Sequence, residues 1–211
     1  MLTIRAAGDW RQGQVHARRV DAPRRLVPEV ETAIDAAWAD MQARPNVHLF
    51  NGVITRFVSF HATPDRLDLE LGQTDSKAFV GTNMAHPEFV DRFGPDVMAN
   101  PVGVSPLLVS ADNFIVMGRR HATLAYYPGW IHPFAGSMDP SDAGPFAAVH
   151  RELREELSLS PGDLADIRLT GIVEDHRLRQ SELIFYVQSR RTRDELIAAV
   201  DDEEHHGTWF V

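Results

Sequence analysis

Leucine alternates with charged residues in the segment "RLDLELGQT", which places Leu67, Leu69 and Leu71 on one face of an extended chain. Alternation with a period of two is the pattern of a strand that buries one face. The preceding segment "HLFNGVITRFVSF" is rich in β-branched and aromatic residues, and "HATPD" between the two segments has the composition of a tight turn. The pattern therefore predicts a β-hairpin over residues 48–74.

A helical pattern comes before this hairpin, in "PEVETAIDAAWADMQARP". Proline is tolerated in a first helical turn and ends a helix when it follows one, so a helix is predicted from Pro28 to Ala43. Residues 75–94 predict short helices and loops. Two apolar runs, Ser105–Ser110 and Phe114–Arg119, flank the turn "SADN" and predict a second hairpin.

The last third of the chain also contains both predicted strands and a predicted helix. "DIRLTGIVED" and "ELIFYVQS" predict two strands, "RDELIAAV" predicts a short helix, and "GTWFV" predicts a final strand. Interleaved strands and helices, with some strand pairs joined directly, indicate a mixed sheet in an α/β sandwich with helices on both faces. The seam between an N-terminal extension and the core is expected near Asn100–Gly103.

Carboxylates are crowded in "HRELREELSL", where Glu152, Glu155 and Glu156 lie within five residues. Pro145 suits a first helical position, which predicts a helix from Pro145 to Leu157. At about 100° per residue, the three glutamates fall in a wedge of about 100° beside an apolar stripe. The stripe consists of Val149, Leu153 and Leu157.

Two interpretations fit this acidic helix. A solvated helix face is the common one, with Arg151 paired to Glu155 at i,i+4. The other is a metal site, because the glutamates adjoin the buried stripe and follow a loop rich in glycine, proline and aspartate, "YPGWIHPFAGSMDPSDAGP". Clustered carboxylate and carbonyl oxygens are the ligands that Mg²⁺ or Mn²⁺ prefers.

The same residues resemble the Nudix hydrolases, whose box reads G-x5-E-x7-R-E-U-x-E-E-x-G-U with U aliphatic. "RELREELSL" matches the second half, except that Ser158 replaces a glycine. Counted from Gly136, Asp142 falls where the first glutamate belongs, and Arg151 arrives one residue late. The box loop therefore has a one-residue insertion, with aspartate in place of glutamate.

The resemblance implies a Nudix-type α/β/α sandwich with a mixed β-sheet, formed by residues 101–211, and an N-terminal α+β extension, residues 1–100, that packs on this core. It implies that Glu155 and Glu156 bind Mg²⁺ or Mn²⁺, and that Glu152 is a metal ligand or general base. Arg151 would orient a glutamate by a salt bridge, and the carbonyl of Gly136 would complete the metal's ligands.

Further site residues are expected outside the box. Many Nudix enzymes add an acidic ligand, and Glu204, in "DDEEHH", is the first candidate, with Glu182 as the second; a solvated charge run is the alternative for Glu204. Arg119 and Arg120 end a strand that should approach the site and are candidates for phosphate binding, or else surface charges. Tyr126, Tyr127 and Trp130 could stack on a base, although packing is the more common role of such residues.

A second resemblance covers the first half of the chain. "LDLELGQTDSKAFVGTN" followed by "ANPVGVSPLLVSADNFIVMGRR" is similar to the Nudix subgroup that hydrolyses UDP-glucose. It implies a metal-dependent hydrolase of a nucleoside diphosphate linked to another group, with a UDP-sugar as the expected substrate. ADP-ribose or a dinucleotide is the near alternative, and a Nudix-fold sensor that binds a nucleotide without cleaving it is the third.

Composition narrows these functions. A net charge of −9 disfavours a nucleic-acid binder, which would need a basic stripe, but allows an anionic small substrate if a cation is bound. The absence of cysteine excludes thiol catalysis and cysteine zinc sites. No apolar run is long enough for a membrane span, and no secretory signal is visible, so a cytoplasmic protein is expected. The sequence does not fix the oligomeric state.

Overall fold

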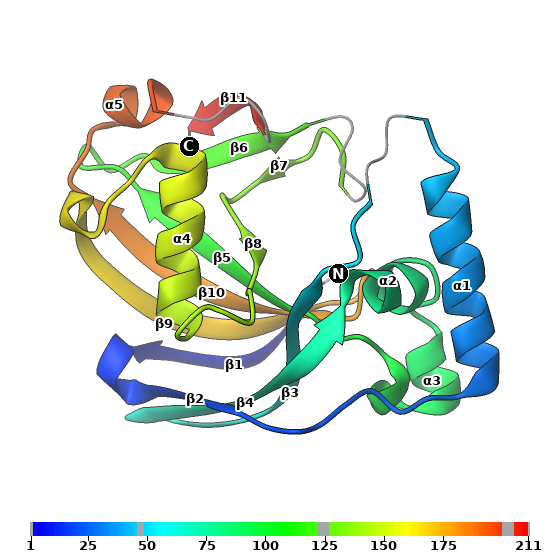
Figure 1. The fold of residues 1–211 in the computed structure, drawn as a ribbon. Coiled ribbons are helices and arrows are strands. Elements are labelled where there is room, and N and C mark those ends of the chain that lie inside the picture. The colour runs from blue at the N-terminus through cyan, green and yellow to red at the C-terminus, as the bar shows by residue number, and fades with distance from the viewer. Residues whose placement is uncertain (1, 46–48, 122–126, 200–204, 211) are drawn as a thin grey trace.

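The computed structural model describes residues 2–45, 49–121, 127–199 and 205–210, the last range only in its backbone pairing. The chain forms two sheets, with helices grouped at two places (Figure 1). Helix α4 (Pro145–Leu157) lies beside the larger sheet, whereas α1 (Pro28–Gln42), α2 (Ser76–Phe79) and α3 (Phe89–Phe93) gather at the other end of the view. No helix of the described residues is long and apolar enough to span a membrane.

The larger sheet has eight strands in the described part of the chain, and it is mixed. Strands β10 and β5 are parallel, and the other neighbours along the sheet are antiparallel. Strands β5 and β6 pair only near their turn, after which β8 pairs with β5 and β7 with β6. The strands, in spatial order, are β1 (Leu2–Trp10), β9 (Leu164–Asp175), β10 (Gln180–Ser189), β5 (Val102–Val109), β6 (Ile115–Arg120) and β11 (His205–Phe210), with β7 (Ile131–His132) and β8 (Gly136–Ser137) off this path.

The smaller sheet consists of β2 (Val15–Arg19), β4 (Arg66–Asp75) and β3 (Val53–Thr63), in that order. Strands β3 and β4 form the predicted hairpin, and β2 adds to β4 in parallel. The remaining elements are α5 (Arg193–Ile197), a π turn at Val80–Met84, and 3₁₀ turns at Gln12–Gln14, Pro95–Val97 and Pro161–Asp163.

One hydrophobic core joins the two sheets and α4. Leu67, Leu69 and Leu71 of β4 belong to the same buried cluster as Leu153 of α4 and Phe185 of β10. A second cluster fills the space among α1, α2 and α3 and includes Val30, Ile34, Phe79, Phe89 and Met98. The alternating leucines that predicted a strand therefore pack on the core that also holds the acidic helix.

The mixed α/β fold confirms the predicted fold class. Helix α4 has the predicted bounds, and α1 ends one residue earlier than predicted, at Gln42. Strands β1 and β2 were not predicted, and β1 pairs with β9 at the edge of the larger sheet. The division into residues 1–100 and 101–211 stays a proposal, and the pairing of β1 and the shared core both cross that boundary.

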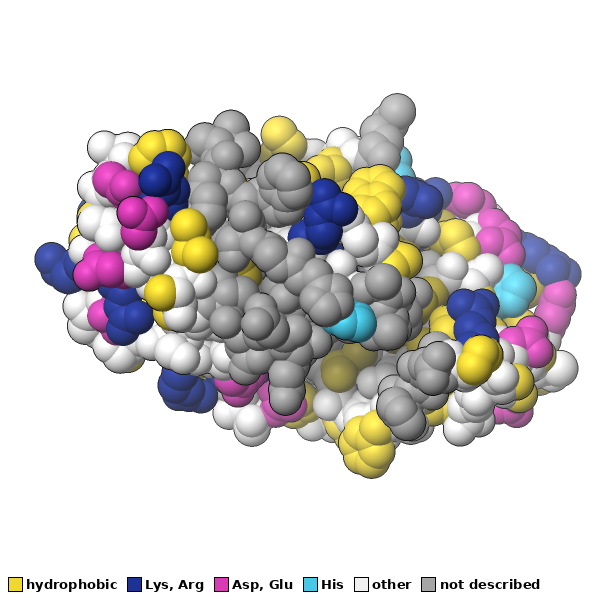
Figure 2. Space-filling view, turned by 90° about the horizontal axis from the view of Figure 1, so that it is seen from above, with side chains coloured by type: hydrophobic (Ala, Val, Ile, Leu, Met, Phe, Trp, Pro, Cys, Tyr) yellow, Lys and Arg dark blue, Asp and Glu magenta, His cyan; other side chains and the backbone are white. Residues whose placement is uncertain are grey.

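Charges of both signs are mixed on the face seen from above. Figure 2 shows basic and acidic side chains interspersed toward both ends of this face, among the residues that it colours. On this face, and among the residues that Figure 2 colours, the interspersed charge forms no basic stripe of the kind that nucleic-acid binding needs.

Replacing Leu69 with alanine tests the shared core. Leu69 is 1% exposed, so Leu69→Ala should lower the free energy of unfolding by about 2–5 kcal/mol through lost burial and a residual cavity. Chemical denaturation followed by fluorescence should still show one transition. Val53→Ala is the control, because Val53 is 55% exposed and its change should stay within about 0.5 kcal/mol. Two separate transitions, with only the first shifted, would contradict a shared core.

Candidate active site

Helix α4 is held on the sheet by its apolar stripe. Val149, Leu153 and Leu157 have no exposed surface. The helix ends at Leu157 because Ser158 adopts a left-handed conformation, with φ of 52° and ψ of 31°. This is the position at which the box of the family has glycine, the residue that adopts this conformation at least cost. The N–H of Ser158 donates a hydrogen bond to the carbonyl of Arg154, at 3.0 Å, and so stabilises the last turn of the helix.

The three glutamates of the helix differ in exposure. Glu152 and Glu156 are buried, with 7% and 5% of their surface exposed, whereas the side chain of Glu155 is 53% exposed. They lie on the flank between the apolar stripe and solvent, as helical geometry requires. The helix is therefore more than a solvated face, because two of its carboxylates are removed from bulk water.

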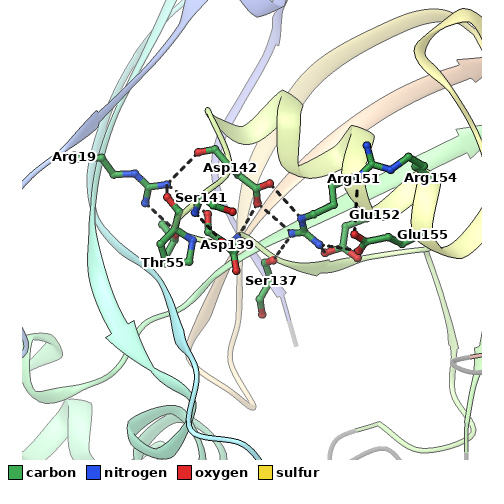
Figure 3. A network of polar contacts seen from close by, with 11 residues as sticks. Arg19, Thr55, Ser137, Asp139, Ser141, Asp142, Arg151, Glu152, Arg154 and Glu155 are labelled. Atoms are coloured by element: carbon green, nitrogen blue, oxygen red, sulfur yellow. Dashed lines mark hydrogen bonds and ion pairs between the residues drawn. The ribbon is translucent and has the colours of Figure 1, made fainter.

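Arg151 connects these glutamates to the loop before the helix (Figure 3). Its Nη1 donates to Glu152 Oε1 at 2.8 Å and to Glu155 Oε2 at 3.1 Å. Its Nε and Nη2 donate to the two carboxylate oxygens of Asp142, at 3.2 and 3.1 Å, and Nη2 also donates to the carbonyl of Ser137 at 3.0 Å. One guanidinium thus fixes two box glutamates and the aspartate that occupies the place of the first box glutamate.

Gly136 lies directly against Glu152. A Cβ atom at position 136 would be 2.0 Å from Glu152 Oε1, so any side chain there would displace the carboxylate. The glycine is therefore needed for close approach and not for an unusual backbone conformation. It brings a backbone strand and a buried carboxylate together at one point.

Burial raises the pKa of Glu152 to about 7. The positive charge of Arg151 acts in the opposite direction, and the negative charges of Glu156 and Glu155 add to the rise. The pKa of Arg151 is itself raised: burial lowers it, but the hydrogen bond to Asp142 and the charges of Glu152 and Asp142 outweigh that effect. Neighbouring negative charge is thus not fully balanced by the one arginine.

These residues fit a divalent cation by the type of their donors. The carboxylates of Glu152, Glu155 and Glu156, together with the carbonyl of Gly136, form an all-oxygen set of the kind that Mg²⁺ or Mn²⁺ binds. In the described ranges, no three acidic or histidine side chains already stand in a metal-holding arrangement. Glu155 accepts a hydrogen bond from Arg151 through its Oε2.

The other predicted site residues lie in different surroundings. Glu204 lies outside the described residues. Arg120 is buried, and its charge lowers the pKa of Glu182, which indicates that the two groups are close. Arg119 is partly exposed and pairs in register with Ile131 of β7. Phosphate binding by either arginine stays a prediction.

A cavity of about 460 Å³ lies on the side of Gly136 away from its contact with Glu152 and is lined by no residue of α4 itself. Its floor is formed by alternate residues of three neighbouring strands: Gln180, Glu182 and Ile184 of β10, Val173 and Asp175 of β9, and Ser105 of β5. Its wall runs along the segment that contains β7 and β8 and includes Gly136. Because Gly136 also contacts Glu152, the cavity and the helix meet at this residue.

Polar groups on the cavity floor are held close together. Ser105 Oγ donates to Glu182 Oε2 at 2.9 Å, and the carboxylate of Glu182 covers Gly103, which has no side chain to displace it. Burial raises the pKa of Glu182 to about 7, the hydrogen bond from Ser105 opposes this rise, and the charge of Asp175 adds to it. Among the described residues, the buried Oε1 of Gln180 has no hydrogen-bond partner.

Aromatic rings and an arginine line another part of the cavity. The rings of Tyr127 and Trp130 lie 5.1 Å apart, and the guanidinium of Arg177 lies 5.4 Å from each. The hydroxyl of Tyr127 donates to Asp175, and burial with this hydrogen bond raises the pKa of Tyr127. Trp130 is 55% exposed, so one side of this group is open.

The sequence analysis named Tyr127 and Trp130, together with Tyr126, which lies outside the described residues. It did not find Gln180, Asp175 or Arg177. Alternation along β10 was the available signal, because Gln180 and Glu182 share the parity of Ile184 on one face of the strand. Arg177 lies in the turn between β9 and β10, where no periodic sequence pattern indicates which residues face the cavity.

Comparison with known proteins identifies the family of this chain. The NUDIX domain model matches residues 99–211, more than half of the chain. The protein therefore belongs to the Nudix family, and its class is that of the Nudix pyrophosphohydrolases.

Two similar proteins are both called uridine diphosphate glucose pyrophosphatase NUDT22. The Bos taurus protein is 29% identical over 206 residues, which cover 82% of this chain and 70% of the bovine chain. The Homo sapiens protein is 27% identical over 243 residues, covering 97% and 80%. Among solved structures, a MutT protein from Methanosarcina mazei aligns with a TM-score of 0.38 and 20% identity, over 53% of this chain and 75% of that one.

Gly136→Ala tests the contact between the cavity wall and Glu152. The added methyl group would displace the carboxylate, and because that carboxylate ends a flexible side chain, the fold should persist. Turnover should fall by about 10- to 100-fold, since small displacements of catalytic groups are costly, with little change in melting temperature. Gly13→Ala is the control, because a Cβ there meets nothing within 4 Å. Full activity in Gly136→Ala would show that the position of Glu152 is not critical.

Proposed function

We propose that the protein is a divalent-metal-dependent hydrolase of a nucleoside diphosphate linked to another group, with a UDP-sugar as its substrate. The observation that carries this proposal is the meeting of two sites at Gly136, a cavity of about 460 Å³ on one side and the buried Glu152 on the other. The cavity lies within the range of about 300–1,000 Å³ found for small-molecule sites.

The acidic helix would hold the metal and the diphosphate. Glu152, Glu155 and Glu156 would bind Mg²⁺ or Mn²⁺ with the carbonyl of Gly136. A divalent cation held there would screen the charge of the diphosphate, polarise the phosphoryl oxygens and lower the pKa of bound water. Arg151 orients Glu152 and Glu155 and is itself held by Asp142. The buried Glu152 can serve as metal ligand or as general base.

The cavity would hold the nucleoside. Its open aromatic group offers a stacking surface, and base stacking on aromatic side chains tolerates any base. Selectivity for one base then depends on the floor of the cavity, where the carboxamide of Gln180 has a hydrogen-bond donor and an acceptor side by side. The imide edge of uracil, with N3–H between two carbonyl oxygens, complements such a pair. Arg120, near Glu182, is the candidate for contact with phosphate.

The names of the relatives favour the same substrate. Proteins called UDP-glucose pyrophosphatase match 82% and 97% of this chain, which includes the N-terminal extension as well as the Nudix domain. ADP-ribose or a dinucleotide is the alternative substrate class, and binding without cleavage is the alternative function.

A hydrolysis screen tests the proposal. The full chain, with Mg²⁺ or Mn²⁺, should release a nucleoside monophosphate and a sugar phosphate from UDP-sugars faster than it cleaves ADP-ribose, NADH or dinucleoside polyphosphates. Chelation of the metal should abolish the reaction. Preferential cleavage of ADP-ribose would show that the substrate is not a UDP-sugar. Tight nucleotide binding without any product would show that the protein is a nucleotide sensor and not a hydrolase.

Glu155→Gln separates a metal ligand from a solvated surface residue. The change weakens the ion pair of Glu155 with Arg151 and its longer contact with Arg154, at 4.0 Å. Pairs of this kind at the surface contribute about 0.3–0.5 kcal/mol each, so stability should hardly change. Loss of an anionic metal ligand should lower turnover by about 100-fold or more, equivalent to about 2.7 kcal/mol of transition-state stabilisation. Thermal melting and steady-state kinetics in saturating Mg²⁺ measure the two effects.

Glu29→Gln is a matched control for this substitution. Its side chain is 54% exposed, similar to that of Glu155, and it is also paired with an arginine, Arg92. It lies on α1, at the other end of the molecule from α4 (Figure 1). Glu29→Gln should be silent in both measurements, and a Glu155→Gln protein with wild-type turnover would remove Glu155 from the site.

A further inference from the structure

Arg19 lies at the end of β2, outside the Nudix domain, and reaches the loop that precedes the acidic helix (Figure 3). We propose that Arg19 is a positioning residue for the glutamates of α4, which it controls by fixing this loop, residues 138–144. The inference rests on the proposed function only in that these glutamates serve a bound metal.

The guanidinium of Arg19 spans the gap between the smaller sheet and the loop. Its Nη1 donates to Thr55 Oγ1 at 2.9 Å, and Thr55 is fully buried on β3. Its Nη2 points to three carbonyl oxygens of the loop, those of Pro140 at 3.2 Å, Asp142 at 3.3 Å and Asp139 at 3.5 Å. A cation surrounded by carbonyl dipoles stabilises the bent backbone that brings them together.

The backbone of β3 supports the start of the same loop. The N–H of Thr55 donates to the carbonyl of Met138 at 3.0 Å. Thr55 therefore contacts the loop directly through its backbone and indirectly through Arg19. A buried strand residue and an arginine, both of the smaller sheet, therefore contact the loop from the same side (Figure 3).

The loop transmits its position to the glutamates through Asp142. The Asp142 carboxylate accepts from the N–H of Asp139 at 2.8 Å, which closes a tight turn, and it accepts two hydrogen bonds from Arg151. Its side chain is only 6% exposed. Arg151 in turn holds Glu152 and Glu155. A shift of residues 139–142 would therefore move the groups that orient both glutamates.

This loop needs an external support. It is one residue longer than the regular Nudix box, and a longer loop has more conformations to lose. The helix that follows starts at Pro145, and its N-cap residue, Gly144, has no side chain to cap the first turn. Neither the length of the loop nor a cap on the following helix therefore fixes the loop conformation. The guanidinium of Arg19 fixes it through hydrogen bonds to three loop carbonyls.

Arginine suits this role better than lysine. Its planar group places donors on two sides at once, toward Thr55 and toward the loop, and it remains charged at any physiological pH. A lysine would keep the charge but not the simultaneous contacts. Because Arg19 is exposed, its ion–dipole contacts should contribute little to stability. Its effect should appear in the geometry of the site.

The test compares Arg19→Met and Arg19→Lys with Arg18→Met in the full chain. Arg18 is the adjacent residue on β2, is 72% exposed and pairs with Glu70, away from the loop. Three quantities are measured: hydrogen exchange of the peptide covering residues 138–144, the dissociation constant for Mn²⁺ alone by calorimetry, and steady-state hydrolysis of a UDP-sugar over a range of Mg²⁺ concentrations. Melting temperatures verify that all variants are folded.

Arg19→Met should speed exchange of the loop peptide and weaken Mn²⁺ binding about fivefold. It should also lower kcat by about tenfold without changing KM, as expected for a misplaced catalytic group. Arg19→Lys should recover part of each loss, and Arg18→Met should match the wild-type protein. Unchanged loop exchange and Mn²⁺ affinity in Arg19→Met would overturn the inference.

The same measurements distinguish this inference from the proposed function. If the wild-type protein cleaves none of the substrates, but Arg19→Met loosens the loop and weakens Mn²⁺ binding, the proposed function fails and the positioning role stands. If the wild-type protein cleaves a UDP-sugar and Arg19→Met does so with unchanged kcat and unchanged Mn²⁺ dependence, the proposed function stands and the positioning role fails.

Discussion

The buried carboxylate of Glu152 is the constraint on which the rest of the site depends. A carboxylate removed from water loses solvation, and two neighbouring glutamates increase the cost of its charge. Arg151 offsets part of this cost through a hydrogen bond to Glu152 at 2.8 Å. Gly136 leaves room for the carboxylate because it has no side chain. Asp142 then holds Arg151 in place, so the box loop becomes part of the electrostatic balance. A divalent cation would complete that balance with the charge that one arginine cannot supply.

Local signals allowed the acidic helix to be predicted residue by residue. Pro145 at its start, the stripe of Val149, Leu153 and Leu157, and the glutamates beside that stripe are all encoded within thirteen consecutive residues. The β3–β4 hairpin was predicted for the same reason, because alternation in "RLDLELGQT" reflects burial of Leu67, Leu69 and Leu71. Patterns of this kind reveal elements whose burial repeats with the period of the backbone.

Strands β1 and β2 and the cavity carry no such signal. Most residues of β1 and β2 are exposed, so neither strand shows a buried face in its sequence. The cavity is assembled from separate segments of β5, β9, β10 and the chain around β7 and β8, which only the sheet topology brings together. Arg19 is likewise more than 100 positions from the carbonyls it contacts. Contacts at such separation depend on the three-dimensional fold and leave no local pattern.

The N-terminal extension is thereby tied to the chemistry of the Nudix domain at three levels. Its first strand completes one edge of the larger sheet, its leucines share the core that supports α4, and its arginine contacts the loop that holds Arg151. The sheet pairing and the shared core determine stability, whereas the arginine contact concerns geometry, because exposed ion–dipole contacts contribute little free energy. An insertion in the box loop would weaken a Nudix site that had to hold its own loop. Here the insertion is accommodated because residues outside the domain, Arg19 and Thr55, fix the loop in place of the regular spacing.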